Sequence, residues 1–140
     1  ERAIFDNILP NRQMWYMVAA YKAKEKSEEL FTSGFRNGKA DAYRYTLWNA
    51  LSTLLIGSSL TEQLTTAHED KPPTYNYTTK ENQMDYYNNN KGRNIGLVSS
   101  FLTVYDNVNN YLTLGYLRYL NNLDSSSLAT INSILIPTDQ

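Results

Sequence analysis

Apolar residues recur three and four positions apart along most of the chain, which is the spacing of an amphipathic helix. The first such series predicts a helix that begins near Pro10, because proline fits the first helical turn. Its apolar positions are Met14, Met17, Val18 and Tyr21. A run of charged residues of both signs over 22–29 is typical of a solvated helix face. Gly34 and Gly38 predict that a loop follows this helix.

A second helix is predicted over residues 41–56, with Asp41 as its N-cap and Gly57 after its end. Its core positions form one stripe: Leu47, Leu51, Leu54 and Leu55. An adjoining face carries a mixed set of residues, since positions three and four apart are neighbours on a helix: Tyr45, Trp48, Asn49 and Ser52.

A third helix is predicted from the capping box at residues 59–62, in which Ser59 is the cap and Glu62 reaches back to it. This helix is expected to end near His68. Four of its residues share one face: Leu60, Leu64, Ala67 and His68. His68 is the only histidine of the chain, and we expect it to point inward.

Pro72 and Pro73 interrupt the helical pattern, and a loop is predicted from there to about Thr79. A second capping box over 78–81, with Thr78 as its cap, predicts the start of a fourth helix. Four positions of this helix share one face: Asp85, Asn88, Asn89 and Gly92. A polar stripe is unusual on a helix that packs into a core, so this face is a candidate site.

Another helix is predicted from four later apolar positions: Tyr111, Leu114, Leu117 and Leu120. Residues 121–127 form a polar connection. The apolar segment 128–136 is predicted either as a short helix or as an extended tail that packs on the bundle. We therefore expect one all-α domain over 1–140, an irregular bundle of five or six helices with a polar cluster at its centre. The motifs that form this cluster lie in 41–92.

The composition agrees with a globular domain and excludes several classes of function. The chain has 140 residues, of which 41% are apolar and 13% aromatic, and this is enough for a single core. The formal net charge is −1 and the basic residues are dispersed, which argues against a nucleic-acid partner. No apolar run reaches the roughly 18 residues of a transmembrane segment. Cysteine is absent, so disulfides, thiol nucleophiles and thiolate metal ligands are excluded.

The chain begins with Glu1 rather than Met, and we expect that an upstream segment, such as a signal peptide, was removed or left out. The absence of cysteine does not fix the compartment, because many exported bacterial proteins also lack it. We expect an exported protein, whether periplasmic, on the cell surface or secreted, whose signal lies outside this chain.

His68 is the leading candidate for chemistry, because histidine is the usual general base near neutral pH and a frequent metal ligand. Glu69 or Asp85 is a candidate to orient its ring. The alternative is a core histidine whose hydrogen bonds are satisfied internally. Asp85, Asn88 and Asn89 together suit a hydroxyl-rich ligand, a peptide backbone or a hard cation. Their structural alternative is to cap neighbouring helices and tie down loops.

Arg44 is a candidate for bidentate binding of a carboxylate or phosphate, or for a structural ion pair with Asp85 or Glu69 across helices. Four aromatic residues are candidates for a sugar- or peptide-binding wall, or else for the core: Tyr45, Trp48, Tyr86 and Tyr87. The sequence contains no Gly-x-Ser-x-Gly and no His-Glu-x-x-His motif. It therefore predicts no resident metal and identifies no cofactor.

Three short motifs resemble those of a bacterial domain family of uncharacterised function. The family pattern runs Arg-His-x-x-Trp-Asn, then His-Glu, then Met-Asp-x-His-Asn-Asn-x-x-Gly. The residues that match are Asp41, Arg44, Trp48, Asn49, His68, Glu69, Met84, Asp85, Asn88, Asn89 and Gly92. The segment 135–138 is also similar to the end of some members, so the resemblance covers about residues 40–138.

Two positions depart from the pattern of that family. The histidine after its arginine is Tyr45 here, and the histidine before its asparagine pair is Tyr87. If the family site uses histidines as metal ligands or as an acid and base, this chain keeps His68 alone. The resemblance therefore implies a diverged member.

We carry two functional hypotheses from the sequence. The first is a domain of unknown function that serves as a non-catalytic binding or structural module, with an unknown small molecule or protein as its partner. Its ligand-binding candidates are Arg44, Trp48, Asn49, Asn88 and Asn89. The second is a hydrolase-like enzyme, with or without a metal, that uses His68 together with Glu69 and Asp85.

Overall fold

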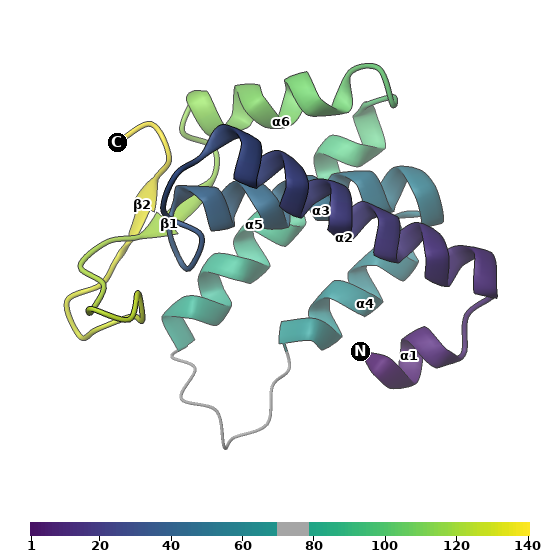
Figure 1. The fold of residues 1–140 in the computed structure, drawn as a ribbon, viewed down its shortest axis with the longest axis horizontal. Helices are drawn as coiled ribbons and strands as arrows, with labels where there is room; N and C mark the ends of the chain where they lie inside the picture. The colour runs from purple at the N-terminus through teal and green to yellow at the C-terminus, as the bar shows by residue number, and fades with distance from the viewer. Residues whose placement is uncertain (70–78) are drawn as a thin grey trace.

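The computed structural model describes residues 1–69 and 79–140 (Figure 1). Its helices are α1 (Arg2–Asp6), α2 (Pro10–Leu30), α3 (Lys39–Ile56), α4 (Ser58–Glu69), α5 (Thr79–Val98) and α6 (Val104–Thr113). Two short strands follow, β1 (Arg118–Leu120) and β2 (Leu135–Pro137). The expected all-α bundle is confirmed, with this strand pair as an addition at one end. The loop predicted after Pro73 and the cap predicted at Thr78 lie outside the described residues.

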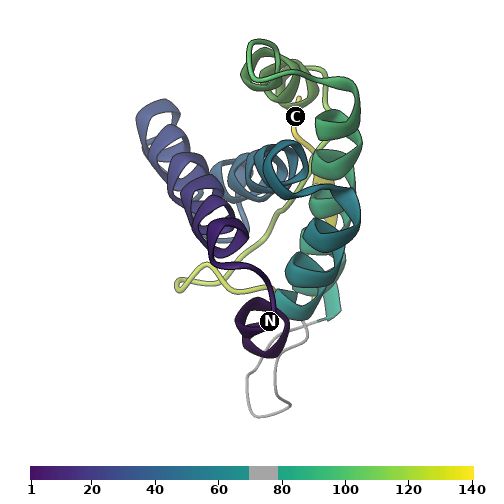
Figure 2. The ribbon, with the colours of Figure 1, turned by 90° about the vertical axis from the view of Figure 1, so that its right-hand side faces the viewer.

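Helix α3 is the centre of the bundle. Figure 2 shows it between α2 on one side and α4 and α5 on the other, and α6 also packs against it. Because its neighbours surround it, every residue from Ala40 to Thr53 is buried except Arg44. The predicted apolar stripe of Leu47 and Leu51 is part of the core, but so is the mixed face beside it. Polar side chains on α3 must therefore find partners inside the protein.

The buried face of α2 differs from the predicted one. Met14, Met17 and Tyr21, which carry the predicted apolar spacing, are 52%, 61% and 65% exposed, so this spacing does not mark the buried face. The buried residues are instead Tyr16, Ala19, Ala23 and Ser27. Most of these side chains are small and recur every four residues, which lets α2 approach α3 closely. Proximity to α3, rather than hydrophobicity, selects the face of α2 that is buried.

The chain enters α3 by a tight turn. The helix begins at Lys39 with Gly38 as its cap, so the prediction of Asp41 as the N-cap is wrong. Gly34 has a φ of 78°, and a Cβ on Gly38 would lie only 2.6 Å from the Cα of Gly34. Asp41 lies in the first helical turn, where its Oδ2 accepts a 2.7 Å hydrogen bond from the backbone N–H of Asn37. The aspartate thus stabilises the preceding loop rather than the free N–H groups of the helix.

Helix α4 begins two residues earlier than a cap at Ser59 predicts. Because it starts at Ser58, Ser59 lies within its first turn, and the prediction of Ser59 as the cap is wrong. Gly57 alone separates α3 from α4 and has a φ of 90°. Glycine adopts this conformation without the steric penalty of a side chain, so the chain changes direction within one residue.

The helix predicted through Leu120 is wrong in its second half. Helix α6 ends at Thr113, and Gly115 then adopts a φ of 79°, which ends a helix readily. Leu117 and Leu120 are buried at the start and end of an extended segment, where β1 pairs with β2 in antiparallel fashion. For residues 128–136 the extended alternative is confirmed, since Leu135 begins β2.

Two glycines allow α5 to lie directly against α3. A Cβ on Gly92 would lie 2.3 Å from the carbonyl oxygen of Thr46 and 2.7 Å from the Cβ of Asn49. A Cβ on Gly96 would lie 2.7 Å from the carbonyl oxygen of Ala50. The glycine of the third motif is therefore required by helix packing.

The two longest helices, α2 and α5, have 21 and 20 residues. Both carry several charged side chains. Within the described residues, no helix combines the length and the apolar character needed to cross a membrane.

Candidate functional site

A pocket of about 610 Å³ opens among α1, α2, α3 and α4. Part of its lining is apolar or aromatic: Phe5, Tyr16, Met17, Ala20, Tyr45 and Trp48. The other part is charged or ionisable: Glu1, Arg2, Asp6, Arg44 and His68. Small-molecule sites typically combine an apolar wall of this kind with a few convergent polar groups.

The apolar wall is a series of rings in mutual contact. The ring centroid of Trp48 lies 5.3 Å from that of Tyr16 and 5.9 Å from that of Tyr45. His68 meets Trp48 edge-on, with centroids 5.2 Å apart and planes at 90°. Phe5 of α1 extends the series at 6.3 Å from Tyr16. Rings at these distances stabilise one another, so they form a rigid wall.

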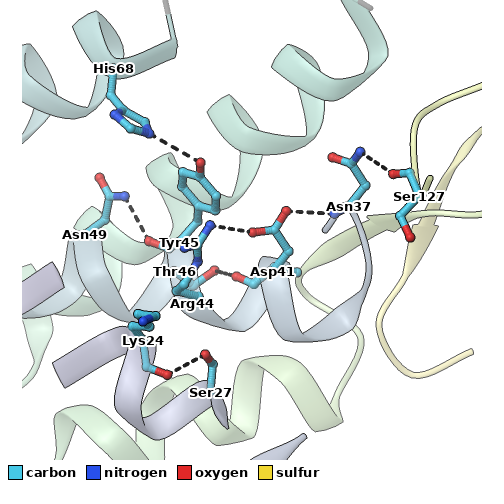
Figure 3. Close-up of polar contacts among 11 residues, drawn as sticks. Lys24, Ser27, Asn37, Asp41, Arg44, Tyr45, Thr46, Asn49, His68 and Ser127 are labelled. Carbon is cyan, nitrogen blue, oxygen red and sulfur yellow. Dashed lines mark hydrogen bonds and ion pairs between the residues drawn. The ribbon is translucent and has the colours of Figure 1, made fainter. Parts of the chain in front are cut away.

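His68 lies on the pocket side of α4, with a third of its side chain exposed. Its Nε2 lies 3.5 Å from the hydroxyl oxygen of Tyr45 (Figure 3), and its Nδ1 lies 3.2 Å from Oε1 of Glu1. A carboxylate only accepts hydrogen bonds, so we assign the proton to Nδ1. In the neutral ring, Nε2 is then left to accept from Tyr45. His68 thus points inward as expected, but its side chain faces the pocket rather than the centre of the core.

Glu1 connects α1 to this wall. Its Oε2 accepts a 2.7 Å hydrogen bond from the hydroxyl of Tyr16, while Oε1 faces His68. Burial acts to raise the pKa of Glu1, but the hydrogen bonds from His68 and Tyr16 outweigh burial and the pKa is lowered. Burial and the hydrogen bond to Glu1 raise the pKa of Tyr16, which therefore remains a protonated donor.

Arg44 contributes to the pocket while it forms a structural ion pair. Its guanidinium donates to Oδ1 of Asp41 at 3.0 Å (Figure 3) and lies 5.1 Å from the ring centroid of Tyr45. Burial acts to lower the pKa of Arg44, but the charge of Asp41, the hydrogen bond to it and the nearby Tyr45 and Asp85 together outweigh burial, and the pKa is raised. The guanidinium therefore remains charged and fixed, with 39% of the side chain exposed.

Glu69 and Asp85 do not belong to the pocket lining. They are 1% and 7% exposed. Burial, followed by the charges of Asp85 and Glu69, raises the pKa of Tyr45, so both carboxylates act on the hydroxyl of this tyrosine. Among the described residues, neither carboxylate oxygen of Glu69 has a hydrogen-bond partner. The structure thus brings the three candidate catalytic residues near Tyr45, but His68 alone reaches the pocket.

Asn49 and Asn89 are buried between helices, away from the pocket. The Nδ2 of Asn49 donates to Oδ1 of Asn89 at 2.7 Å and to the carbonyl oxygen of Tyr45 at 2.9 Å (Figure 3 draws the second bond). The hydroxyl of Thr65 donates to Oδ1 of Asn49 at 2.9 Å. These bonds connect α3, α4 and α5 inside the core.

Asn88 connects α5 to the strand pair. Its Nδ2 donates to the carbonyl oxygen of Arg118 at 2.8 Å, and its Oδ1 accepts from the N–H of Arg118 at 3.0 Å. The side-chain amide thus satisfies both backbone groups of one strand residue. Of the five ligand-binding candidates, Arg44 and Trp48 line the pocket, whereas the three asparagines tie elements together. Tyr86 and Tyr87 are also absent from the lining.

The geometry also bears on metal binding. In the described part of the chain, no three His, Asp or Glu side chains gather in an arrangement that would hold a metal ion. The three candidate catalytic residues therefore offer no converging ligand set, since they divide between the pocket and the interior.

Sequence reasoning missed the contribution of the first sixteen residues to the pocket. The segment before Pro10, for which no element was predicted, supplies Glu1 and Phe5, and Tyr16 was not among the predicted apolar positions of α2. A usable signal was the spacing of Tyr16, Ala19 and Ala23, which marks a second apolar face of the helix.

The fold and its pocket thus define an all-α domain with a candidate binding pocket among its first four helices. The chain belongs to a family described as a domain of unknown function (DUF6973), whose model matches residues 8–114. This range contains α2 through α6, so α1 and the strand pair lie outside it. The match begins and ends earlier than the expected resemblance over 40–138. No curated protein and no solved structure gives a significant match to the chain.

Proposed function

We propose that this domain is a non-catalytic binding module of an exported bacterial protein and that its pocket binds a small amphipathic molecule. The pocket carries the proposal, because its volume of about 610 Å³ is in the range of small-molecule sites. Its ring wall suits an apolar body, and Arg44 and His68 suit a polar end.

The candidate catalytic residues are divided between the pocket and the protein interior, and this division supports binding rather than catalysis. Of the three candidate catalytic residues, only His68 lines the pocket, and its Nδ1 already faces Glu1. A general base must reach the proton that it abstracts, and Glu69 and Asp85 are buried behind the lining. The polar cluster on α3, α4 and α5 instead acts as an internal scaffold.

Export and bacterial origin form the second part of the proposal. The support for this part is that the three motifs resemble those of a bacterial family. Fractionation of bacteria that express the full-length protein tests this part. Recovery of the protein solely from the cytosol would contradict it.

The binding proposal is tested with three small probes that share a benzyl group: phenylacetamide, phenylacetate and phenethylammonium. Because His68 is the only histidine, its imidazole proton signals in an NMR titration report on the pocket without ambiguity. At least one probe should shift these signals saturably. The variant Ala20→Trp should abolish the shift, because Ala20 lines the pocket and an indole would fill it.

The matched control is Lys22→Trp, which adds the same side chain to an exposed position of α2 outside the pocket and should leave binding intact. The binding proposal fails if none of the probes causes a saturable shift. It also fails if Ala20→Trp binds as well as the unaltered protein.

The alternative, a hydrolase-like activity, makes a different prediction. Turnover of an ester of phenylacetic acid would have to depend on His68 and on both interior carboxylates. Loss of turnover in His68→Ala, Glu69→Gln and Asp85→Asn would favour this alternative. Binding of the probes without turnover favours the binding module.

A further inference from the structure

We infer that the pocket contains a carboxylate subsite formed by Tyr16 and His68, and that Glu1 of the chain itself occupies this subsite. The inference rests on the proposed binding function and specifies its ligand class. That class is a small carboxylic acid with an aromatic or apolar body.

Two donors from different helices meet one carboxylate. The hydroxyl of Tyr16, on α2, donates to Oε2 of Glu1 at 2.7 Å, and Nδ1 of His68, on α4, lies 3.2 Å from Oε1. One donor for each oxygen gives a carboxylate two charge-assisted hydrogen bonds. A ligand hydroxyl or amide group offers only one acceptor oxygen, so it cannot give each of the two donors an oxygen of its own as a carboxylate does.

Both donors are held in place before any ligand arrives. Tyr16 is 5% exposed and packs 5.3 Å from Trp48, and the ring of His68 stands edge-on to the same indole. Donors that are already fixed lose little conformational entropy when they bind a ligand. The lowered pKa of Glu1 agrees with this arrangement, because the surroundings favour its charged form despite burial.

Glu1 is a replaceable occupant of the subsite. Helix α1 has five residues, none of them buried, and a helix this short has little stability of its own. Apart from Glu1, α1 is held by a hydrogen bond of 2.9 Å from Nε2 of Gln13 to the carbonyl oxygen of Phe5, by the ring contact of Phe5 with Tyr16, and by the packing of Ile4, which is only partly buried. Glu1 therefore behaves as a tethered ligand, with an effective concentration on the order of millimolar.

An external carboxylate that displaces Glu1 would place its apolar body against the rings of Trp48 and Phe5. Asp6 is the second carboxylate of the lining, but it pairs with Arg2 at 3.6 Å and both side chains are mainly exposed. Asp6 thus offers a matched control, because it carries the same charge at the other end of α1 without contact with the two donors.

The test compares phenylacetate with phenylacetamide, which has the same shape without the charge, by NMR titration of the His68 imidazole signals. Glu1→Ala should bind phenylacetate about tenfold or more tightly than the unaltered protein, because the tethered competitor is removed. The affinity for phenylacetamide should change less than about twofold. Asp6→Ala should change the affinity for phenylacetate much less than Glu1→Ala does, because Asp6 lines the pocket without contact with either donor. Glu1→Gln, which keeps the side-chain length, should change affinity in the same direction as Glu1→Ala.

A second variant tests the donors themselves. In the Glu1→Ala background, Tyr16→Phe should weaken phenylacetate binding about tenfold, the worth of a hydrogen bond to a charged group. The ring remains in place, so the binding of phenylacetamide should change less.

Three outcomes overturn the carboxylate subsite. Equal gains for both probes in Glu1→Ala would mean that α1 only covers the pocket, and the proposed binding function would stand. Equal gains in Glu1→Ala and Asp6→Ala would mean that general electrostatics, not a subsite, governs affinity. Absence of binding by both probes, in the unaltered protein and in Glu1→Ala, would overturn the subsite inference and leave phenethylammonium to decide the binding function.

Discussion

Replacement of Gly92 by alanine tests whether the third motif serves helix packing. The added Cβ would lie 2.3 Å from the carbonyl oxygen of Thr46 and 2.7 Å from the Cβ of Asn49. One of these atoms belongs to the backbone of α3, so a change of side-chain rotamer does not relieve the clash. The two helices must separate, and the bond between Asn49 and Asn89 would lengthen with them.

Two opposing effects set the size of the change. Alanine favours the helix interior over glycine by about 0.5–1 kcal/mol. Overpacking of a well-filled core costs about 1–3 kcal/mol, and sometimes more. Because the backbone clash is severe and central to the bundle, we expect overpacking to exceed helix propensity. The net loss in the free energy of unfolding should be at least about 1–2 kcal/mol.

Urea denaturation measured by circular dichroism gives this free energy from the midpoint and slope of the transition. The control is Asn90→Ala, which substitutes an exposed residue of the same helix. It should be neutral or slightly stabilising, by about 0.5 kcal/mol or less. If Gly92→Ala were as stable as the unaltered protein, helix propensity would dominate and the packing role of this glycine would be refuted.

Two further predictions concern the ties that hold the elements together. Asn88→Ala leaves the N–H and the carbonyl of Arg118 without their side-chain partner and should cost at least about 2 kcal/mol in the same assay, since each unpaired buried group costs about 1–3 kcal/mol. A loss no larger than that of Asn90→Ala would contradict this role. For Glu1, the pKa is lowered on folding, so its stabilising contribution is complete above the ordinary value of 4.5 and disappears as the pH falls through the lowered value. Glu1→Gln should therefore have a lower melting temperature than the unaltered protein at pH 7 but an equal one in strong acid, and a difference that persisted in acid would refute the linkage.

Much of the fold was predictable because helix formation leaves a local signal. The apolar spacing and the glycines located α2 through α5 within a few residues, and the all-α class followed from them. The helix prediction failed where apolar residues at helical spacing are buried for another reason. The spacing of Leu117 and Leu120 suited a helix, but Gly115 turns the chain and both leucines serve a strand pair.

The candidate site was predictable only in part. Arg44, Trp48 and His68 were identified from motifs and do line the pocket. The asparagines were identified from the same motifs but are buried ties, because a polar residue that a packed helix turns inward must bond internally. A motif marks the residues that a fold requires as well as those that a ligand contacts.

The sequence by itself determined that the segments of α2 through α5 form helices, because helical periodicity depends on residues within a few positions of one another. The tertiary structure alone decided which face of α2 is buried and how the pocket is built. Tyr16, Trp48 and His68 come from three helices and Glu1 precedes a fourth, and only the packing around α3 brings their side chains together. Such contacts depend on residues far apart in the chain, so a local sequence pattern does not predict them.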